Sequence, residues 1–526
     1  MRNKTLLLSA VLALATAAPA GAATASEAAA TGTATGVVST IATATDTTTD
    51  TTTGTGAGAV STAGAEHGAG LGAGLGRRIL PANDGWASAG TGTTGGAAAP
   101  PANVHTVTSR SQLAAALAAP GPRIIYVKGR LDSGRSCADY ATDGYTLAGY
   151  LAAYDPAVWG RDAEPSGPLE DARAASAANQ TAHIKLKVPS DTTIVGLPGA
   201  TIRHLNLHVD KADNVIIRNI RFEDAVDCFP QWDPTDGETG NWNSLYDNIS
   251  VTGSTHVWVD HNTFTDGTNP DSAQPLYFGR PYQVHDGQTD ITNGSDFVTV
   301  SWNEFSGHDK TMLIGSTNNP AADAGKLSVT VHHNHFSDTL QRLPRVRFGK
   351  VHVYDNYYEV PDAATFVYAI GVGVQSQIVA ENNYFRLSRA VDPAALLYDW
   401  GGTTLTARGN LLRVGGKERP IDLVGVYNAA HDPDLGTDAG WTPTLHTRID
   451  PAGTVRREVS RHAGAGHLSC PVPVPTGAAI APGPGRLRPR APRALRAGLA
   501  IEPGPRVGVI MHKFGPAPLR LRILQA

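Results

Sequence analysis

The central part of the chain repeats one short pattern of apolar and polar positions. Two β-forming residues stand two positions apart, another residue follows three positions later, and an aromatic residue comes two positions after that. A period of two residues is that of a β-strand, whereas a helical repeat would show a period of 3.6 residues. The units are Val215, Ile217, Ile220, Phe222; Val257, Val259, Asn262, Phe264; Val298, Val300, Asn303, Phe305; Val329, Val331, Asn334, Phe336; Val351, Val353, Asn356, Tyr358; and Ile378, Ala380, Asn383, Phe385.

The spacing of these units predicts how the strands are connected. The steps between unit starts range from 42 residues (215 to 257) down to 22 residues (329 to 351). A variable step with a minimum near 22 is typical of a coil of strands in which additional residues form loops. Equivalent residues of successive turns would lie about 4.8 Å apart, so the aligned asparagines and aromatic residues would form internal ladders.

We therefore predict an all-β fold, a right-handed parallel β-helix in which long loops form a cleft. The handedness follows because crossovers between parallel strands are nearly always right-handed. The alternative is an ordinary β-sandwich in which the asparagines recur by coincidence.

The segment before the repeats has a different pattern. An extended run is expected over residues 104–108, and a short helix over residues 109–118. Ser109 is a candidate N-cap, and Gln112 would complete a capping box. An unbroken apolar run at residues 124–127 predicts a buried strand.

The two ends of the chain differ from its body in composition. Residues 1–23 have a basic start, an apolar stretch too short to span a bilayer and a small-residue cleavage site, which predicts a secretory signal peptide. Residues 24–84 are rich in Ala, Thr and Gly, which predicts a disordered linker. The body spans residues 85–467. Residues 468–526 form a Pro/Arg-rich tail that either binds anionic polymers or is an unselected extension.

Charge and cysteine content exclude several classes of protein. The formal net charge is only −4, so nothing indicates a nucleic-acid partner. No segment after the signal has the roughly 18 apolar residues that a membrane helix needs. We expect a secreted, extracellular monomer. Three cysteines are too few for a disulfide framework, and both a Cys137–Cys228 disulfide and two buried free thiols remain open.

Acidic residues gather in the longest loops, where binding sites are usual. Asp286 and Asp290 are four positions apart, and Gly287 permits a turn between them. Carboxylates held close together repel each other unless a cation lies between them. Oxygen ligands suit Ca²⁺ or Mg²⁺. By itself this motif is more typical of a solvated loop, since surface carboxylates are common.

Four stretches carry a resemblance to a known family. From residue 85 to about 467, the chain resembles a bacterial pectate lyase of the parallel β-helix type, polysaccharide lyase family 1. The resemblance implies a secreted, Ca²⁺-dependent enzyme that cleaves α-1,4-polygalacturonate by β-elimination to 4,5-unsaturated oligogalacturonides. The stretches are Phe229-Pro230-Gln231-Trp232-Asp233-Pro234, Val257-Trp258-Val259-Asp260-His261, His285-Asp286-Gly287-Gln288-Thr289-Asp290 and Gln341-Arg342-Leu343-Pro344-Arg345-Val346-Arg347-Phe348-Gly349.

The same resemblance assigns roles to individual residues. It implies Ca²⁺ ligands at Asp247, Asp286 and Asp290, substrate-binding cations at Lys310 and Arg347, and the catalytic base at Arg342. Some members have another acidic ligand where this chain has Leu245.

An arginine base is unusual, because arginine is normally always charged. The neighbouring cations are expected to lower the pKa of Arg342 and to give an alkaline optimum.

Three other functions fit parts of the sequence. A pectin lyase would replace the acidic ligands, a polygalacturonase would need a pair of carboxylates, and a β-helix wall-binding protein would need no base. Asp260 and His261 are expected to serve as structural hydrogen-bonding residues. His285 and His308 flank the site and either take part in it or hydrogen-bond a neighbouring loop. The indoles of Trp232, Trp242 and Trp258 either stack on sugars or pack inside the protein.

Overall fold

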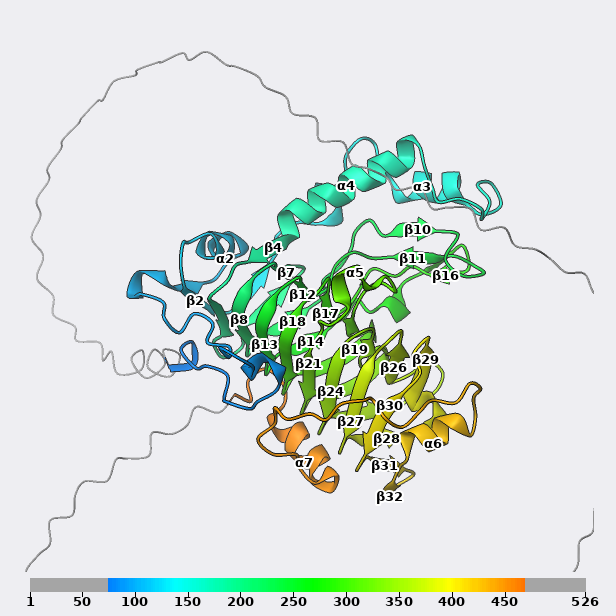
Figure 1. The fold of residues 1–526 in the computed structure, drawn as a ribbon. Helices are drawn as coiled ribbons and strands as arrows, with labels where there is room; N and C mark the ends of the chain where they lie inside the picture. Colours follow the sequence, from blue (N-terminus) through cyan, green and yellow to red (C-terminus); the bar gives the residue numbers. More distant parts are fainter. Residues whose placement is uncertain (1–73, 469–526) are drawn as a thin grey trace, which may run out of the picture. The chain divides into compact units, whose positions relative to one another are not determined.

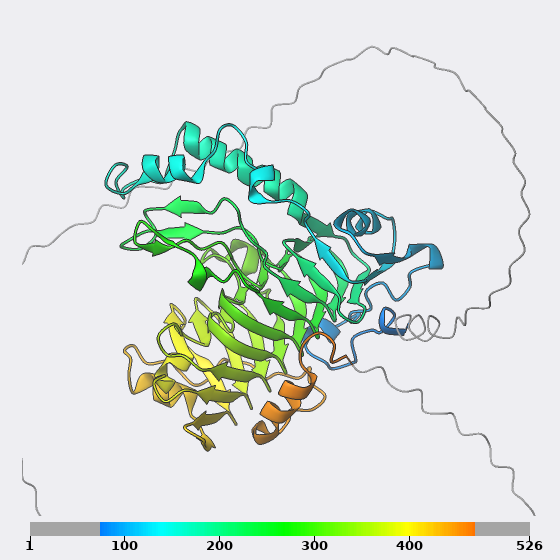
Figure 2. The same cartoon turned by 180° about the vertical axis from the view of Figure 1, so that it is seen from behind.

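The computed structural model describes residues 74–468, and these form a coil of parallel strands (Figures 1 and 2). Most turns of the coil contribute one strand to each of three long sheets. The first sheet is β1 (Val104–Val107), β2 (Arg123–Val127), β5 (Thr192–Gly196), β8 (Asp213–Arg218), β13 (Thr255–Asp260), β18 (Asp296–Ser301), β21 (Val329–His332), β24 (Lys350–Tyr354), β27 (Gln377–Glu381) and β30 (Leu405–Arg408).

The other two sheets complete the walls of the coil. The second is β3 (Arg130–Asp132), β6 (Thr201–Arg203), β9 (Arg221–Glu223), β14 (Thr263–Thr265), β19 (Glu304–Lys310), β22 (His335–Gln341), β25 (Tyr357–Val360), β28 (Tyr384–Leu387), β31 (Leu411–Val414) and the antiparallel β32 (Lys417–Pro420). The third is β4 (Lys185–Val188), β7 (Asn206–Asp210), β12 (Ile249–Thr252), β17 (Thr289–Thr292), β20 (Leu313–Ile314), β23 (Arg345–Val346), β26 (Ile370–Gly373) and β29 (Leu397–Trp400). The predicted parallel β-helix is confirmed.

The repeat units align in the register that the sequence predicts. Val257 pairs with Val215 on one side and with Val298 on the other, and the later units continue the series. Inside the coil, Asn262 donates its side-chain N–H to the Asn303 Oδ1 at 3.1 Å, and the ladder continues one turn at a time to Asn410. The aromatic rings from residue 222 to residue 385 stack with centroids 4.6–5.2 Å apart.

The residue before each ladder asparagine has a left-handed backbone. A bend of two residues joins the first sheet to the second, and its second residue is the buried asparagine. The first residue therefore recurs at one position of every turn, a position that side chains other than glycine seldom occupy. These residues are His261 (φ 50°), Trp302 (φ 55°), His333 (φ 54°), Asp355 (φ 53°) and Asn382 (φ 52°).

The N-terminal elements largely match their predictions. Helix α2 spans Arg110–Leu117, and the Ser109 side chain accepts a hydrogen bond from the Gln112 backbone N–H at 3.3 Å. The reciprocal half of the capping box differs, because the Gln112 side chain accepts from the Thr108 N–H at 2.8 Å. Strand β2 confirms the buried run at residues 124–127.

Two helices that the periodicity did not predict lie beside the coil: α3 (Leu147–Tyr154) and α4 (Pro168–Ile184), which leads into β4 (Figure 1). A disulfide joins Cys137 to Cys228, with the Cα atoms 5.3 Å apart, which decides between the two alternatives left by the sequence. Two short hairpins, β10 (Gln231–Asp233) with β11 (Asn241–Asn243) and β15 (Leu276–Tyr277) with β16 (Arg280–Pro281), lie in the long loops.

The chain outside the coil is described only in part. Residues 74–84 fell in the predicted linker, but Leu75 and Leu80 are buried, so this stretch packs against the coil because it carries large apolar side chains. The predicted signal peptide, the rest of the linker and nearly all of the predicted tail lie outside the described residues. Within residues 74–468, no helix is long and apolar enough to cross a membrane. Helix α6 (Leu423–Asn428) and helix α7 (Ala452–His462) follow the last strands.

Candidate active site

Three carboxylates meet on the third sheet. Asp247 precedes β12, Asp286 precedes β17, and Asp290 lies within β17. One oxygen from each lies within 4.8 Å of the others, and we call these residues the acidic cluster. The turns that carry them are neighbours, because Ser250 of β12 pairs with Asp290. The structure thus brings together the three residues for which the resemblance to a family implied metal binding.

Backbone and side-chain donors hold the acidic cluster in place. Asp247 accepts hydrogen bonds from the Gly287 N–H at 2.9 Å and from the Ser250 hydroxyl. Asp290 accepts from the Leu313 N–H at 2.9 Å. Since Leu313 belongs to β20, the next strand of the same sheet, the coil itself orients the carboxylates.

Gly287 is required for space rather than for a left-handed backbone. A Cβ at this position would lie 2.4 Å from the Asp290 Oδ1 and 2.7 Å from the Asp247 Oδ1, distances that real Cβ atoms do not show. The missing side chain leaves a cradle next to two carboxylates. A donor set made only of oxygen atoms around such a space fits a hard divalent cation such as Ca²⁺.

The carboxylates of the acidic cluster need a nearby positive charge to be ionised together. Burial, followed by the nearby Asp286 carboxylate, raises the pKa of Asp247 to about 7. Burial and the charges of Asp247 and Asp286 raise the pKa of Asp290 well above its usual range. Like charges in a desolvated site cannot all ionise without a cation. One cation is supplied by the protein, since the Lys310 Nζ lies 3.2 Å from the Asp286 Oδ1.

The arginines stand beside this cluster on the next turns. Arg342 follows β22 with a φ of 59°, and its carbonyl accepts from the Met312 N–H at 2.8 Å. Its guanidinium opposes the rise in the pKa of Asp290 and so acts on the acidic cluster directly. Arg347 is held by the Asn318 side chain at 2.8 Å and the Gly315 carbonyl at 2.7 Å. Burial, then the charge of Arg342, lowers the pKa of Arg347.

Arg345 belongs to the same group of cations, although the sequence assigned it no role. Its guanidinium carbon lies 3.7 Å from the centroid of the Trp400 ring. Burial, followed by the charge of Arg347, lowers the pKa of Arg345 to about 10. Arg345 belongs to the arginine-rich stretch of the sequence. Trp400 comes from β29, two strands further along the sheet, and no sequence pattern predicts its contact with Arg345.

A buried polar network supports the loop that carries Asp286. The His308 Nδ1 lies 2.8 Å from the Asp266 Oδ1, and its Nε2 lies 2.8 Å from the Asp286 carbonyl oxygen. A carbonyl oxygen only accepts, so the His308 Nε2 donates to it. Burial alone would lower the pKa of His308, but the charge and hydrogen bond of Asp266 outweigh burial and raise it. Burial alone would lower the pKa of His285, but hydrogen bonds from its ring to Asp224 and Asp271 outweigh burial and raise the pKa to about 10.

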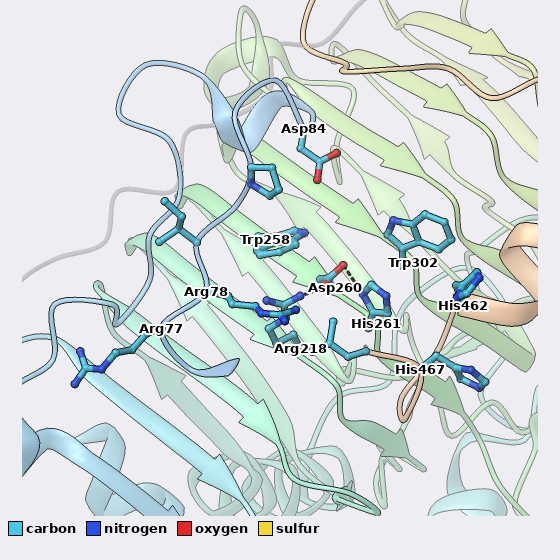
Figure 3. A pocket seen from close by; sticks show the side chains of 13 residues that line it. Arg77, Arg78, Asp84, Arg218, Trp258, Asp260, His261, Trp302, His462 and His467 are labelled. Carbon is cyan, nitrogen blue, oxygen red and sulfur yellow. Dashed lines mark hydrogen bonds and ion pairs between the residues drawn. The ribbon is translucent and has the colours of Figure 1, made fainter. Parts of the chain in front are cut away.

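Asp260 and His261 lie away from the acidic cluster, at a cavity of about 670 Å³ (Figure 3). Asp260 is ion-paired with Arg218 and accepts from the Ser301 hydroxyl at 2.9 Å, which matches the structural role expected for it. Arg218 also lies over the Trp258 ring, 4.3 Å from its centroid. Trp232, Trp242 and Trp258 are all buried, so their indoles pack inside the protein. Leu245, in contrast, is 56% exposed next to the acidic cluster.

The surface of the parallel β-helix thus carries a group of carboxylates, a lysine and arginines that can bind a cation and an anionic ligand side by side. Comparison with known proteins gives the class of protein. A family model described as pectate lyase matches residues 167–410.

A pectate lyase of Bacillus subtilis (strain 168) is 46% identical over 406 residues, which cover 74% of this chain and 94% of the relative. Pectate lyase E of Dickeya chrysanthemi is 34% identical over 364 residues, covering 68% of this chain and 75% of the relative.

Solved structures agree with the sequence relatives. The thermostable pectate lyase PL 47 superposes with a TM-score of 0.74 at 45% identity, covering 75% of this chain and all of that one. A pectate lyase bound to a hexasaccharide superposes with a TM-score of 0.71 at 46% identity, with the same coverage. The chain belongs to the pectate lyase family, and the protein is a pectate lyase.

Proposed function

We propose that this protein is a secreted, Ca²⁺-dependent lyase that cleaves α-1,4-polygalacturonate by β-elimination and releases 4,5-unsaturated oligogalacturonides. The observation that carries the proposal is the acidic cluster around the space left by Gly287. Export is supported by the signal-like residues 1–23. We further propose that it acts as a monomer.

In this proposal Asp247, Asp286 and Asp290 hold Ca²⁺. The bound ion would attract the uronate carboxylate and stabilise the negative charge that develops beside it. Leu245, two residues before Asp247, is exposed and offers no ligand atom where some members of the family have an acidic one. Water and substrate oxygens would complete the coordination there.

Lys310 and Arg347 would position the substrate through fixed positive charge. Lys310 is 7% exposed and Arg347 9%, so both charges are largely desolvated and act strongly on a nearby carboxylate. Arg347 is also oriented by its bonds to Asn318 and Gly315, so little further ordering is required on binding.

Arg342 would remove the proton from C5 of the uronate ring. The electron pair of the C5–H bond forms the C4–C5 double bond, and the C4–O bond breaks to release the leaving sugar with its oxygen. The Arg342 Nε is buried without a hydrogen-bond partner among the described residues, so no protein acceptor competes for the guanidinium there. Removal of a proton from arginine requires surrounding positive charge, which Lys310, Arg347 and a bound cation would supply.

One assay tests the proposal. Polygalacturonate and its methylated form are each incubated with the protein, with and without a chelator, and the absorbance of the unsaturated product is followed. Growth of absorbance on polygalacturonate that stops with chelator and returns with added Ca²⁺ supports the proposal. Chelator-resistant absorbance on the methylated polymer would indicate a pectin lyase, and reducing ends without absorbance would indicate hydrolysis.

A further inference from the structure

A second group of potential metal ligands lies on another part of the coil. One ligand atom each from His333, Asp355 and Asp450 lies within 4.8 Å of the others, and all three residues are buried. We call them the His–Asp cluster. His333 and Asp355 occupy the left-handed bend position of successive turns, after β21 and β24. Asp450 comes from the segment that leads into α7.

The spacing of the His–Asp cluster is too wide for hydrogen bonds. The His333 Nε2 lies 3.6 Å from the Asp355 Oδ2 and 3.7 Å from the Asp450 Oδ2. Two ligands of a tetrahedral ion with bonds of about 2.0–2.1 Å are separated by roughly 3.4 Å. The gap therefore fits ligands that face a common ion better than it fits direct contact.

One carboxylate oxygen in the His–Asp cluster lacks a partner. Asp355 is 0% exposed, and its Oδ2 accepts from the Asp450 backbone N–H at 2.7 Å. Its Oδ1 has no hydrogen-bond partner within the described part of the chain. Such an orphaned buried oxygen is costly, and bound ions are one of the explanations for it.

The contact between His332 and His333 indicates which ring nitrogen of His333 carries no proton. The Nδ1 atoms of His332 and His333 are 2.8 Å apart, so in neutral rings a single proton lies between them. If His333 donates it, the Nε2–H of His332 faces the Asp84 carboxylate at 3.3 Å. The opposite assignment would place a bare nitrogen of His332 against that carboxylate.

The favoured arrangement leaves the lone pair of the His333 Nε2 facing the carboxylates of Asp355 and Asp450. A cation between them would pair with the Nε2 lone pair and with both carboxylates, of which Asp450 also has Arg448 as an ion-pair partner. Metal-bound histidines almost always donate their other ring N–H to a neighbouring acceptor, as His333 would donate to His332 in this arrangement. Trp302 fixes the ring further, stacking on His333 with centroids 4.2 Å apart; Figure 3 shows Trp302 and Asp84 at the adjoining cavity.

We propose that His333, Asp355 and Asp450 bind a divalent first-row transition-metal ion of the zinc type. An imidazole with two carboxylates favours such an ion over Ca²⁺, which prefers oxygen ligands alone. The ion joins the segment before α7 to two turns of the coil, where the Asn382 side chain already donates to the Asp450 carbonyl at 2.8 Å. Its role is structural, and it is independent of the acidic cluster.

The test uses the full-length protein with ZnCl₂ as titrant in excess CaCl₂, which occupies the acidic cluster. Isothermal titration is expected to give one zinc equivalent and a rise in melting temperature. Asp355→Asn is expected to weaken zinc binding by more than about 100-fold, because loss of a ligand exceeds the 10–100-fold cost of losing an outer partner. The matched control Asp286→Asn, in the acidic cluster, is expected to bind zinc with wild-type affinity. Asp355→Asn is expected to cleave pectate as the wild type does.

Two further measurements separate an ion from a second proton on His333, which would satisfy the same carboxylates. Co²⁺ added to the wild-type protein is expected to give visible absorption bands that Zn²⁺ removes. His332→Asn is expected to weaken zinc binding about 10–100-fold by releasing the His333 ring. A wild-type protein that binds neither Zn²⁺ nor Co²⁺, or an Asp355→Asn variant that binds zinc as wild type does, would overturn the proposal.

Discussion

Gly287 donates its backbone N–H to the carboxylate of Asp247 at 2.9 Å, while the space where its side chain would lie is bounded by the carboxylates of Asp247 and Asp290. One residue therefore both orients a ligand and leaves room for a cation. A substitution of Gly287 can therefore test the site, although glycine itself has no functional group.

We expect Gly287→Ala to reduce kcat/KM on polygalacturonate by about 100-fold or more. The added Cβ would approach the Asp290 Oδ1 to 2.4 Å and force the carboxylates apart, and small displacements in an active site can cost that much. Gly453→Ala is the matched control, because its Cβ would meet nothing closer than 3.9 Å. Equal activity of Gly287→Ala and Gly453→Ala would contradict the proposal that the space beside Gly287 is needed to hold a cation.

Arg342→Lys tests the base. The variant keeps a positive charge next to Asp290 but moves the nitrogen and changes its proton affinity, since the two side chains differ in shape and pKa. We expect kcat to fall by at least about 100-fold, the usual size of a general-base contribution, with a smaller change in KM. Turnover near that of the wild type at neutral pH would remove Arg342 from the role of base.

Asp260 should contribute to stability but not to catalysis. Burial alone would raise its pKa, but the charges of His261 and Arg218 outweigh burial and hold the pKa at about 2. A depressed pKa stabilises the fold above the unfolded value of 3.8, and this contribution is lost as the pH falls through 2. Asp260→Asn leaves Arg218 buried and unpaired, so we expect a loss of about 3–5 kcal/mol at neutral pH.

Urea unfolding between pH 7 and pH 2 checks this expectation. The difference in unfolding free energy between wild type and Asp260→Asn should stay constant above about pH 5 and shrink below pH 3.8, because the wild-type carboxyl then takes up its proton. The exposed Asp434→Asn serves as the control. A difference that does not depend on pH would rule out the ion pair as its source.

The asparagine ladder predicts a purely structural phenotype. Asn303 donates to the Val259 carbonyl at 3.0 Å and accepts from the Asn262 backbone N–H at 2.8 Å, and it is fully buried. Asn303→Ala leaves these backbone groups unpaired, at about 1–3 kcal/mol for each. We expect a lower melting temperature with unchanged kcat/KM at 25 °C. An unchanged melting temperature would contradict the importance of the ladder.

Much of the fold could be read from the sequence because each turn of the coil repeats the same local requirements. The alternation of Val257 and Val259 and the stacked Phe264 recur in every unit, and the ladder position Asn262 recurs in every later unit, so the register followed from counting. The resemblance to a family, rather than the spacing of the charges, singled out Asp247, Asp286 and Asp290, which the structure places close together. The roles of these residues and of Arg342 stay predictions.

The sequence by itself determined the coil, since the period of two residues, the buried asparagines and the stacked rings are local features that repeat. Only the tertiary structure decided which distant side chains meet. Trp400 lies under Arg345, and Asp450 reaches His333 and Asp355, because strands and segments far apart in the chain become neighbours when the coil closes. Such contacts depend on loop lengths and on the path of the chain outside the coil, which leave no periodic trace in the sequence.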